Sequence, residues 1–298
     1  MQQSSGSSHY HALQVWVNRR FTDRFAFQAA YTWSHSISDV PLESFTQGAT
    51  DPFNFSLDRG DSDLDRRQTF VGNAIYVLPS FKKWGAAANK ILGDWQLNGI
   101  ASFFGGVPLS VTSGTNTLGL ARGSNFQRPD LVSGVPIYLH NAGDPLQWLN
   151  PAAFALPGSG VKAPNLTSLS GTLGRGVIRS PGFNNIDFSV AKNWQVRERF
   201  GIQFRAEMFN LFNHPNFNGV DTNLAFNNVG ASDFPSVSNP TPATPRGPQF
   251  DPCNGATYTR VDGSTARSPC GLSQNGNFGR LGGNRGPREI QFGIKLSF

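Results

Sequence analysis

The sequence predicts an all-β fold, an antiparallel β-barrel that crosses a membrane with its strands. Several segments alternate between apolar and polar residues, so that a strand there would carry one apolar and one polar face. The connections between these segments are alternately short and long, as in barrels with short turns at one end and long loops at the other. The composition agrees: 33 Gly, 20 Pro and 25 Phe occur among 298 residues, and only 15% are charged, against about 25% in an average soluble protein.

The clearest of these segments is the last one. Apolar residues occupy every second position, and polar residues or glycine fill the gaps. The apolar set is Ile290, Phe292, Ile294, Leu296 and Phe298, and the other set is Gln291, Gly293, Lys295 and Ser297. A tilted strand of about 9–11 residues is long enough to cross a bilayer. We therefore expect the chain to end with an outer-membrane barrel strand, closed by the aromatic Phe298.

Six earlier segments show the same alternation, least regularly in the third. They are residues 13–17, 25–34, 68–78, 95–103, 186–190 and 200–208. Aromatic residues lie toward both ends of the second segment, as in the aromatic girdles at membrane interfaces. The first two segments are joined through Thr22, Asp23 and Arg24, which are few enough for a hairpin. With the final strand, the sequence predicts about seven crossings.

The lengths of the connections predict the orientation and the extent of the barrel. Residues 37–67, 114–182 and 214–287 form long connections, whereas 21–25 and 196–199 are short and 79–94 is intermediate. Because long loops of such barrels are extracellular, we expect the C-terminus to be periplasmic. An odd number of crossings does not close a single-chain barrel of this kind, so residues 1–298 are expected to be the C-terminal part of a larger barrel. A further strand within 128–139 would change the count.

Composition and motifs exclude several other classes. The mean hydropathy of −0.32 and the lack of about 18–20 consecutive apolar residues exclude a helical membrane protein. The net charge of +6 comes from scattered basic residues, so we expect no nucleic-acid partner. No cluster of acid, base or nucleophile supports an enzyme, and we expect no catalytic residue, cofactor or bound metal. The first residues do not read as a signal peptide.

The order of several motifs resembles the Oar-like TonB-dependent receptors of the outer membrane, a family common in acidobacteria. The similar segments are residues 58–67, 76–79, 105–111, 148–154, 182–189, 207–217 and 286–292. The resemblance implies a barrel of about 22 strands, with the plug, TonB box and signal peptide outside these residues. It also implies surrounding outer-membrane lipid and lipopolysaccharide, energy from the TonB complex through regions absent here, and recognition of Phe298 by the barrel-assembly machinery.

An acidic run before the third segment is the first candidate site. It consists of Asp58, Asp61, Asp63 and Asp65, whose spacing could direct several oxygens toward a calcium ion. The glycine and closing glutamate of an EF-hand are missing at the required offsets. We therefore expect a solvated loop with local Asp to Arg pairs. The tripeptide at 59–61 also spells the adhesion motif Arg-Gly-Asp, which in a chain of this length is expected by chance.

Three other pairs of residues are candidates for a site or a specific contact. His9 and His11 share one face of a strand and could begin a metal site, but no third ligand is evident. Arg205 and Glu207 lie on the polar face of a strand, and we expect them in the barrel lumen, paired with each other or with a plug. Cys253 and Cys270, the only cysteines, lie in the last long connection and are expected to form a disulfide, with two free thiols as the alternative.

The predicted function is therefore that of a non-enzymatic barrel segment of an outer-membrane TonB-dependent receptor or transporter, which contributes to uptake of an unidentified substrate. Two alternatives remain. One is a surface module that binds glycans or other cells without transporting anything, and the other is a truncated, non-functional remnant. A plug and a TonB box encoded upstream would favour uptake.

Overall fold

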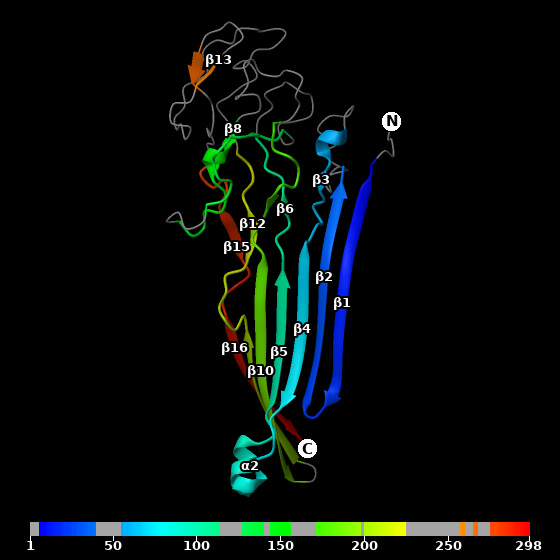
Figure 1. The fold of residues 1–298 in the computed structure, drawn as a ribbon. Helices are drawn as coiled ribbons and strands as arrows, with labels where there is room; N and C mark the ends of the chain where they lie inside the picture. The colour runs from blue at the N-terminus through cyan, green and yellow to red at the C-terminus, as the bar shows by residue number, and fades with distance from the viewer. Residues whose placement is uncertain are drawn as a thin grey trace.

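Seven long strands form one antiparallel sheet in the computed structural model (Figure 1). The structure describes residues 6–39, 55–113, 127–139, 144–155, 171–197, 200–224, 257–259, 265–267 and 275–298. In their order across the sheet, the strands are β1 (Ser8–Thr22), β2 (Phe25–Ser38), β4 (Gln68–Val77), β5 (Gln96–Phe104), β10 (Phe183–Arg197), β11 (Phe200–Phe209) and β16 (Glu289–Ser297). Each strand pairs with its neighbour along the chain. The predicted antiparallel fold with seven strands is confirmed, and the sheet is not closed, as expected of a partial barrel.

The connections divide the sheet into two distinct ends. At the turn end, β1 joins β2 through Asp23 and Arg24, whose φ angles of 50° and 69° are those of a type I′ hairpin turn, the type that matches the strand twist. The β4–β5 connection, the end of β10 and the start of β11 lie at the same end, as does the C-terminus (Figure 1). The described parts of the three long connections and the start of β1 lie at the opposite end, which we call the loop end. The predicted alternation of short and long connections is therefore confirmed.

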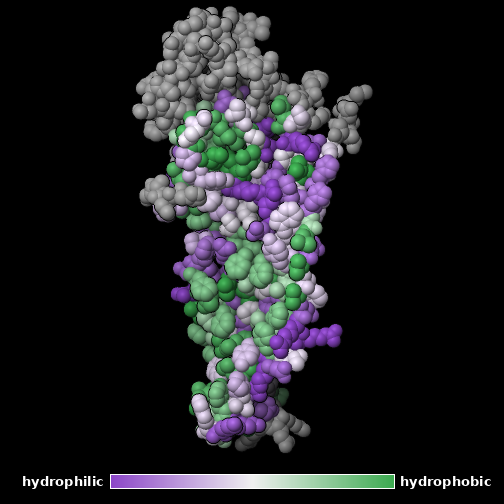
Figure 2. All heavy atoms as spheres, in the orientation of Figure 1, coloured by the Kyte–Doolittle hydropathy of each residue, from purple (hydrophilic) through white to green (hydrophobic). Residues whose placement is uncertain are grey.

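The two faces of the sheet differ in polarity, as the alternation predicts. On one face Val15, Tyr31, Phe70 and Phe103 form a continuous row of neighbours across β1, β2, β4 and β5. On the other face Gln28 lies between Asn18 and Asn73. Many of the apolar side chains are exposed in the protein itself, and hydrophobic residues gather over the middle of the strands (Figure 2). Such a band is the arrangement by which barrel strands contact lipid.

Two short helices occupy the connection between β4 and β5. They are η2 (Lys82–Trp84) and α2 (Ala86–Leu92), and α2 lies at the turn end (Figure 1). None of the helices in the described residues has the length and apolarity that crossing a membrane requires.

The long connections contain further short elements. They are η1 (Phe55–Asp58), β3 (Gly60–Asp61), β6 (Pro108–Leu109), β7 (Asp130–Leu131), η4 (Pro151–Ala153), β8 (Phe154–Ala155), β9 (Ile178–Arg179), β12 (Phe217–Val220), β13 (Thr257–Thr259), β14 (Thr265–Arg267) and β15 (Leu281–Asn284). We call the described residues between β2 and β4, between β5 and β10, and between β11 and β16 the loop layer. Within 128–139, β7 has only two residues and pairs with β8, so this segment adds no crossing.

The best-buried apolar core lies in the loop layer, not in the sheet. Its fully buried members are Val111, Leu149, Ala153, Phe154, Leu173, Ile178, Leu224 and Phe278. Among the described residues of the seven long strands, Ala191 is the only apolar residue that is buried. The apolar side chains of the sheet are largely exposed on one of its faces. Those of the loop layer pack against one another in a buried core, as in a small soluble domain.

Candidate functional site

The acidic run of the sequence lies at the loop end, and arginines from a distant part of the chain contact its carboxylates. Asp58 ends η1, and its carboxylate Oδ1 accepts a hydrogen bond of 3.0 Å from Nη1 of Arg128. The same guanidinium donates to the carbonyl oxygens of Leu57 at 2.6 Å and Leu173 at 3.0 Å. Both charged side chains are buried, with 2% exposure for Asp58 and 8% for Arg128. This ion pair therefore joins the first long connection to the second.

Two more arginines from the second long connection reach the same run. Arg175 Nη2 contacts Asp63 Oδ2 at 2.9 Å, and its Nη1 donates to the carbonyl oxygens of Ser38 and Asp58. Arg179 lies in β9, and its Nη2 contacts Asp61 at 2.5 Å and also Asp65. We call these four aspartates with Arg67, Arg128, Arg175 and Arg179 the arginine clamp.

Local partners complete the clamp. Arg67 contacts Asp61 at 3.0 Å and Asp65 at 2.9 Å. His35 Nε2, on β2, lies 3.0 Å from Asp61 Oδ1, and the backbone N–H of Ser36 donates to Asp65 at 2.6 Å. The predicted local Asp to Arg pairs exist, but the prediction of a solvated loop was wrong, because Asp58 and Asp65 are buried. Their carboxylates face guanidinium groups, and this surrounding positive charge does not suit a calcium ion.

The two connections approach so closely that glycine is required at the contact. A Cβ added at Gly60 would overlap the carbonyl oxygen of Arg175, and one added at Gly176, where φ is 66°, would lie 2.6 Å from the carbonyl oxygen of Asp61. The Arg-Gly-Asp tripeptide is part of this contact. Its glycine and aspartate form β3, which pairs with β2. The aspartate side chain contacts Arg67 and Arg179 of the clamp, so it is not presented for adhesion.

Acid is expected to loosen the clamp through Asp61. Burial opposes ionisation of this carboxyl, but hydrogen bonds from Arg67, His35 and Arg179 outweigh it and hold the pKa of Asp61 below the 3.8 of a free carboxyl. A carboxyl with a lowered pKa stabilises the folded state at pH values above 3.8, and this contribution is lost as the pH falls through the lower folded value. Hydrogen exchange of residues 58–65 and 175–179, corrected for intrinsic rates, should stay constant from neutral pH to about pH 5 and rise below about pH 4.

Asp61→Asn provides the control for this pH dependence. The variant should exchange faster than the parent at neutral pH and lose the part of the acid response that comes from Asp61. An acid response of unchanged size in the variant would assign it to other carboxyls.

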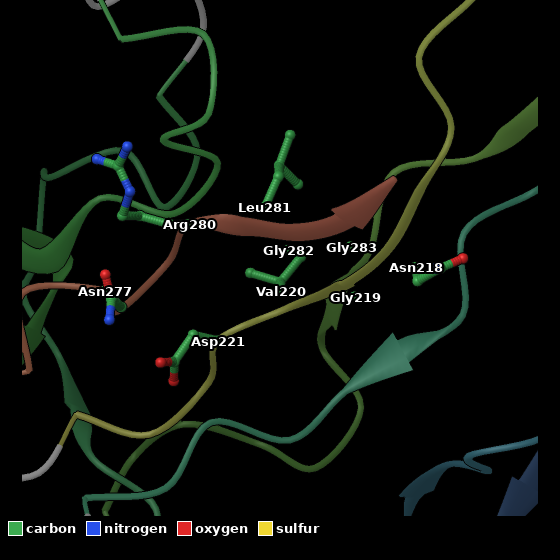
Figure 3. Close-up of a pocket in the computed structure, with 9 residues that line it drawn as sticks. All are labelled: Asn218, Gly219, Val220, Asp221, Asn277, Arg280, Leu281, Gly282 and Gly283. Carbon is green, nitrogen blue, oxygen red and sulfur yellow. The ribbon is translucent and has the colours of Figure 1, made fainter. Parts of the chain in front are cut away.

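A pocket of about 560 Å³ lies elsewhere in the loop layer, between β12 and β15. Its lining residues are Asn218, Gly219, Val220, Asp221, Asn277, Arg280, Leu281, Gly282 and Gly283 (Figure 3). Arg280 contacts Asp144 at 2.5 Å. The pKa of Asp144 is lowered by the backbone N–H of Leu146 and by Arg280, against an opposing effect of desolvation. Amides, one carboxylate and glycine backbone are groups that can hydrogen-bond a neutral polar molecule. In the sequence, only the Asn and Gly residues of these segments could have indicated this pocket.

The two histidines of the possible metal site, His9 and His11, lie on β1. His11 lies opposite His35 across β1 and β2, and the described residues contain no group of three or more potential metal-binding side chains. Arg205 contacts Glu207 at 3.4 Å, which confirms the predicted pairing. Phe298 follows β16 and is 96% exposed. Cys253 and Cys270 lie outside the described residues, so their disulfide stays a prediction.

The comparisons with known proteins agree with this architecture. The chain is 24% identical over 297 residues to the TonB-dependent transporter Oar of Myxococcus xanthus, and the match covers 97% of this chain but 22% of that protein. The chain thus spans about a fifth of the length of this relative. No solved structure matches the chain. A family model described as an outer membrane beta barrel domain matches residues 1–291. With its meander of seven antiparallel strands and one apolar face, the chain belongs to this family of outer-membrane barrels.

Proposed function

We propose that residues 1–298 form the C-terminal wall of a TonB-dependent transporter barrel and contribute to uptake of a substrate across the outer membrane. The observation that carries this proposal is the combination of an open seven-stranded membrane sheet with similarity to Oar along nearly the whole chain. No enzymatic role is proposed. The similarity covers 22% of Oar, and we assign a plug and the contact with the TonB complex, as parts of the same proposal, to regions outside this sequence.

Strand direction supports completion of the barrel by further strands of the same protein. In an antiparallel sheet of seven strands, the first and the last run in the same direction, as β1 and β16 do. Direct pairing of β1 with β16 would therefore be parallel. Two copies with the same orientation in the membrane would meet in the same parallel manner. Closure into an antiparallel barrel instead needs an odd number of additional strands, because an unpaired edge in lipid costs several kcal/mol for each unsatisfied backbone group.

In such a transporter the two ends of the sheet lie in different environments. The loop end faces the outside with its lipopolysaccharide, and the turn end, with Phe298, faces the periplasm. Phe298 is exposed beyond the last strand. This position leaves its ring accessible for binding by the barrel-assembly machinery. A disulfide between Cys253 and Cys270 would close part of the last long connection in this oxidising environment.

Single-cysteine labelling tests the orientation. In a background with Cys253→Ser and Cys270→Ser, Leu64→Cys at the loop end and Asp23→Cys in the β1–β2 turn replace two exposed residues. A membrane-impermeant maleimide should label Leu64→Cys on intact cells, and Asp23→Cys only after the outer membrane is opened. The reverse result would contradict the proposed orientation.

The gene tests the transport role. A reading frame that continues upstream of Met1 into further strands, a plug and a TonB box would support uptake. If the frame encodes neither plug nor TonB box, the transport proposal fails.

The pocket between β12 and β15 supports a second candidate function, surface binding of a glycan. Its Asn218, Asp221 and Asn277 side chains and exposed glycine backbone suit sugar hydroxyls. Binding of the purified protein to a glycan array should then weaken in Asn277→Ala and persist in Asn213→Ala, a control outside the pocket. Equal binding by both variants would remove the pocket from consideration.

A further inference from the structure

The connection between β4 and β5 forms a short helical segment on the apolar face of the sheet at the turn end. Lys192 and Trp194 of β10 lie opposite Phe204 and Ile202 of β11, so these four side chains share one face. Trp95, which follows α2, contacts the rings of Trp194 and Phe204 with centroid distances of 6.2 and 6.3 Å. The segment therefore covers part of the face that the barrel turns toward lipid.

Three side chains fasten the C-terminal end of α2 to the sheet. Trp194 Nε1 donates to the carbonyl oxygen of Lys90 at 2.7 Å, and Trp95 Nε1 donates to that of Ile91 at 2.8 Å. The buried ammonium of Lys192 donates to the carbonyl oxygen of Gly93. Carbonyl groups at a helix end lack partners within the helix and carry a partial negative charge, so these donors both satisfy and fix the helix end.

The outer side of the segment exposes apolar side chains. The exposed fractions are 70% for Trp84, 65% for Ile91 and 46% for Leu92. Phe81 packs against Trp84 with a centroid distance of 5.2 Å. These residues continue the apolar face of the sheet to the level at which tryptophan is enriched in membrane proteins, the boundary between lipid tails and headgroups.

The helical segment carries mainly positive charge. Lys82, Lys83 and Lys90 are exposed. Asp94 is the only acidic residue in the sequence from 79 to 95. Its Oδ1 lies 3.4 Å from Nη1 of Arg24 in the β1–β2 turn. The exposed surface thus combines a tryptophan and two aliphatic side chains with three lysines, which is the composition of helices that lie in a membrane interface and attract anionic lipid.

We infer that residues 82–92 form an interfacial anchor that binds anionic phospholipid in the leaflet at the turn end. The inference rests on the proposed function, which places the apolar face of the sheet in the outer membrane with its turns on the periplasmic side. Trp84, Ile91 and Leu92 enter the boundary between tails and headgroups, and the three lysines recruit phosphate groups of phosphatidylglycerol. Lys192 and Trp194 hold the helix at that depth.

Quenching of Trp84 by brominated lipids tests the anchor. The protein as its gene encodes it is purified from outer membranes and reconstituted with brominated phosphatidylglycerol or brominated phosphatidylcholine at the same mole fraction. The difference between the parent and Trp84→Phe isolates the signal of Trp84. We expect phosphatidylglycerol to quench this signal at least about twofold more strongly, because lysines near the surface enrich anionic lipid. The triple variant K82Q/K83Q/K90Q should lower the ratio to about one, and Arg59→Gln at the loop end should keep it.

The other outcomes are decisive as well. Equal quenching by both lipids, or a ratio that the triple variant leaves unchanged, overturns the inference. Quenching of other tryptophans without quenching of Trp84 shows a barrel whose helical segment is covered by protein, and this result also overturns it. If no tryptophan is quenched, the protein is not embedded in the membrane, and the proposed function itself fails.

Discussion

Arg128→Met is expected to destabilise the loop layer by about 3–5 kcal/mol, the range for removing one partner of a buried ion pair. Methionine preserves much of the side-chain volume but removes the guanidinium that bonds Asp58, Leu57 and Leu173. The carboxylate of Asp58 then stays buried without that positive charge. Limited proteolysis of membrane-embedded protein should cut the described parts of the two connections much faster, while the heat-modifiable mobility of the barrel in electrophoresis stays unchanged.

The double variant Asp58→Asn/Arg128→Met separates charge from packing. Because it also removes the buried negative charge, it should be more stable than Arg128→Met alone, with a coupling energy of more than about 1 kcal/mol between the two sites. Arg205→Gln is the matched control, since Arg205 and Glu207 form an exposed pair, for which about 0–1 kcal/mol is typical. If Arg128→Met and Arg205→Gln have equal effects, the clamp does not hold the connections together.

The strands could be predicted from sequence because their signal is local. In a membrane strand, lipid on one side and the lumen on the other impose a period of two, and each strand carries this pattern independently of its partners. The limits of β10 illustrate where the signal fails. The alternation predicted residues 186–190, whereas β10 spans Phe183–Arg197, because Lys192 interrupts the apolar series. Its ammonium bonds Gly93 beneath α2, a contact that the local pattern cannot reveal.

The candidate site could be predicted only in part, since its partners are distant in sequence. The spacing of the aspartates drew attention to residues 58–65 and to local pairs such as Asp65 with Arg67. The decisive partners, Arg128 and Arg179, lie 70 residues from Asp58 and 118 residues from Asp61. No periodic pattern links such positions, and burial of the aspartates follows from the packing of the second connection over the first. The predicted solvated loop was wrong for this reason.

Phe154→Ala is expected to cost the loop layer about 3–5 kcal/mol, as is usual for truncation of a buried aromatic ring. Phe154 is fully buried, and its ring meets that of Phe278 edge to face with a centroid distance of 5.3 Å. The two rings come from the second and third long connections, so the cavity would loosen the contact between these connections. Hydrogen exchange should therefore accelerate around both residue 154 and residue 278, although only one was changed.

Phe212→Ala tests whether burial, and not the loss of a phenyl ring as such, determines this effect. Phe212 also belongs to the third connection but is 72% exposed, so its truncation leaves no buried cavity and should change stability by less than about 0.5 kcal/mol. If Phe154→Ala left exchange near residue 278 unchanged, the loop layer would consist of independent connections. Joint acceleration would instead identify it as one cooperative unit, in which the apolar core joins the second and third connections while the arginine clamp joins the first and second. A substrate that meets the loop layer would then contact a preformed surface rather than separate flexible loops.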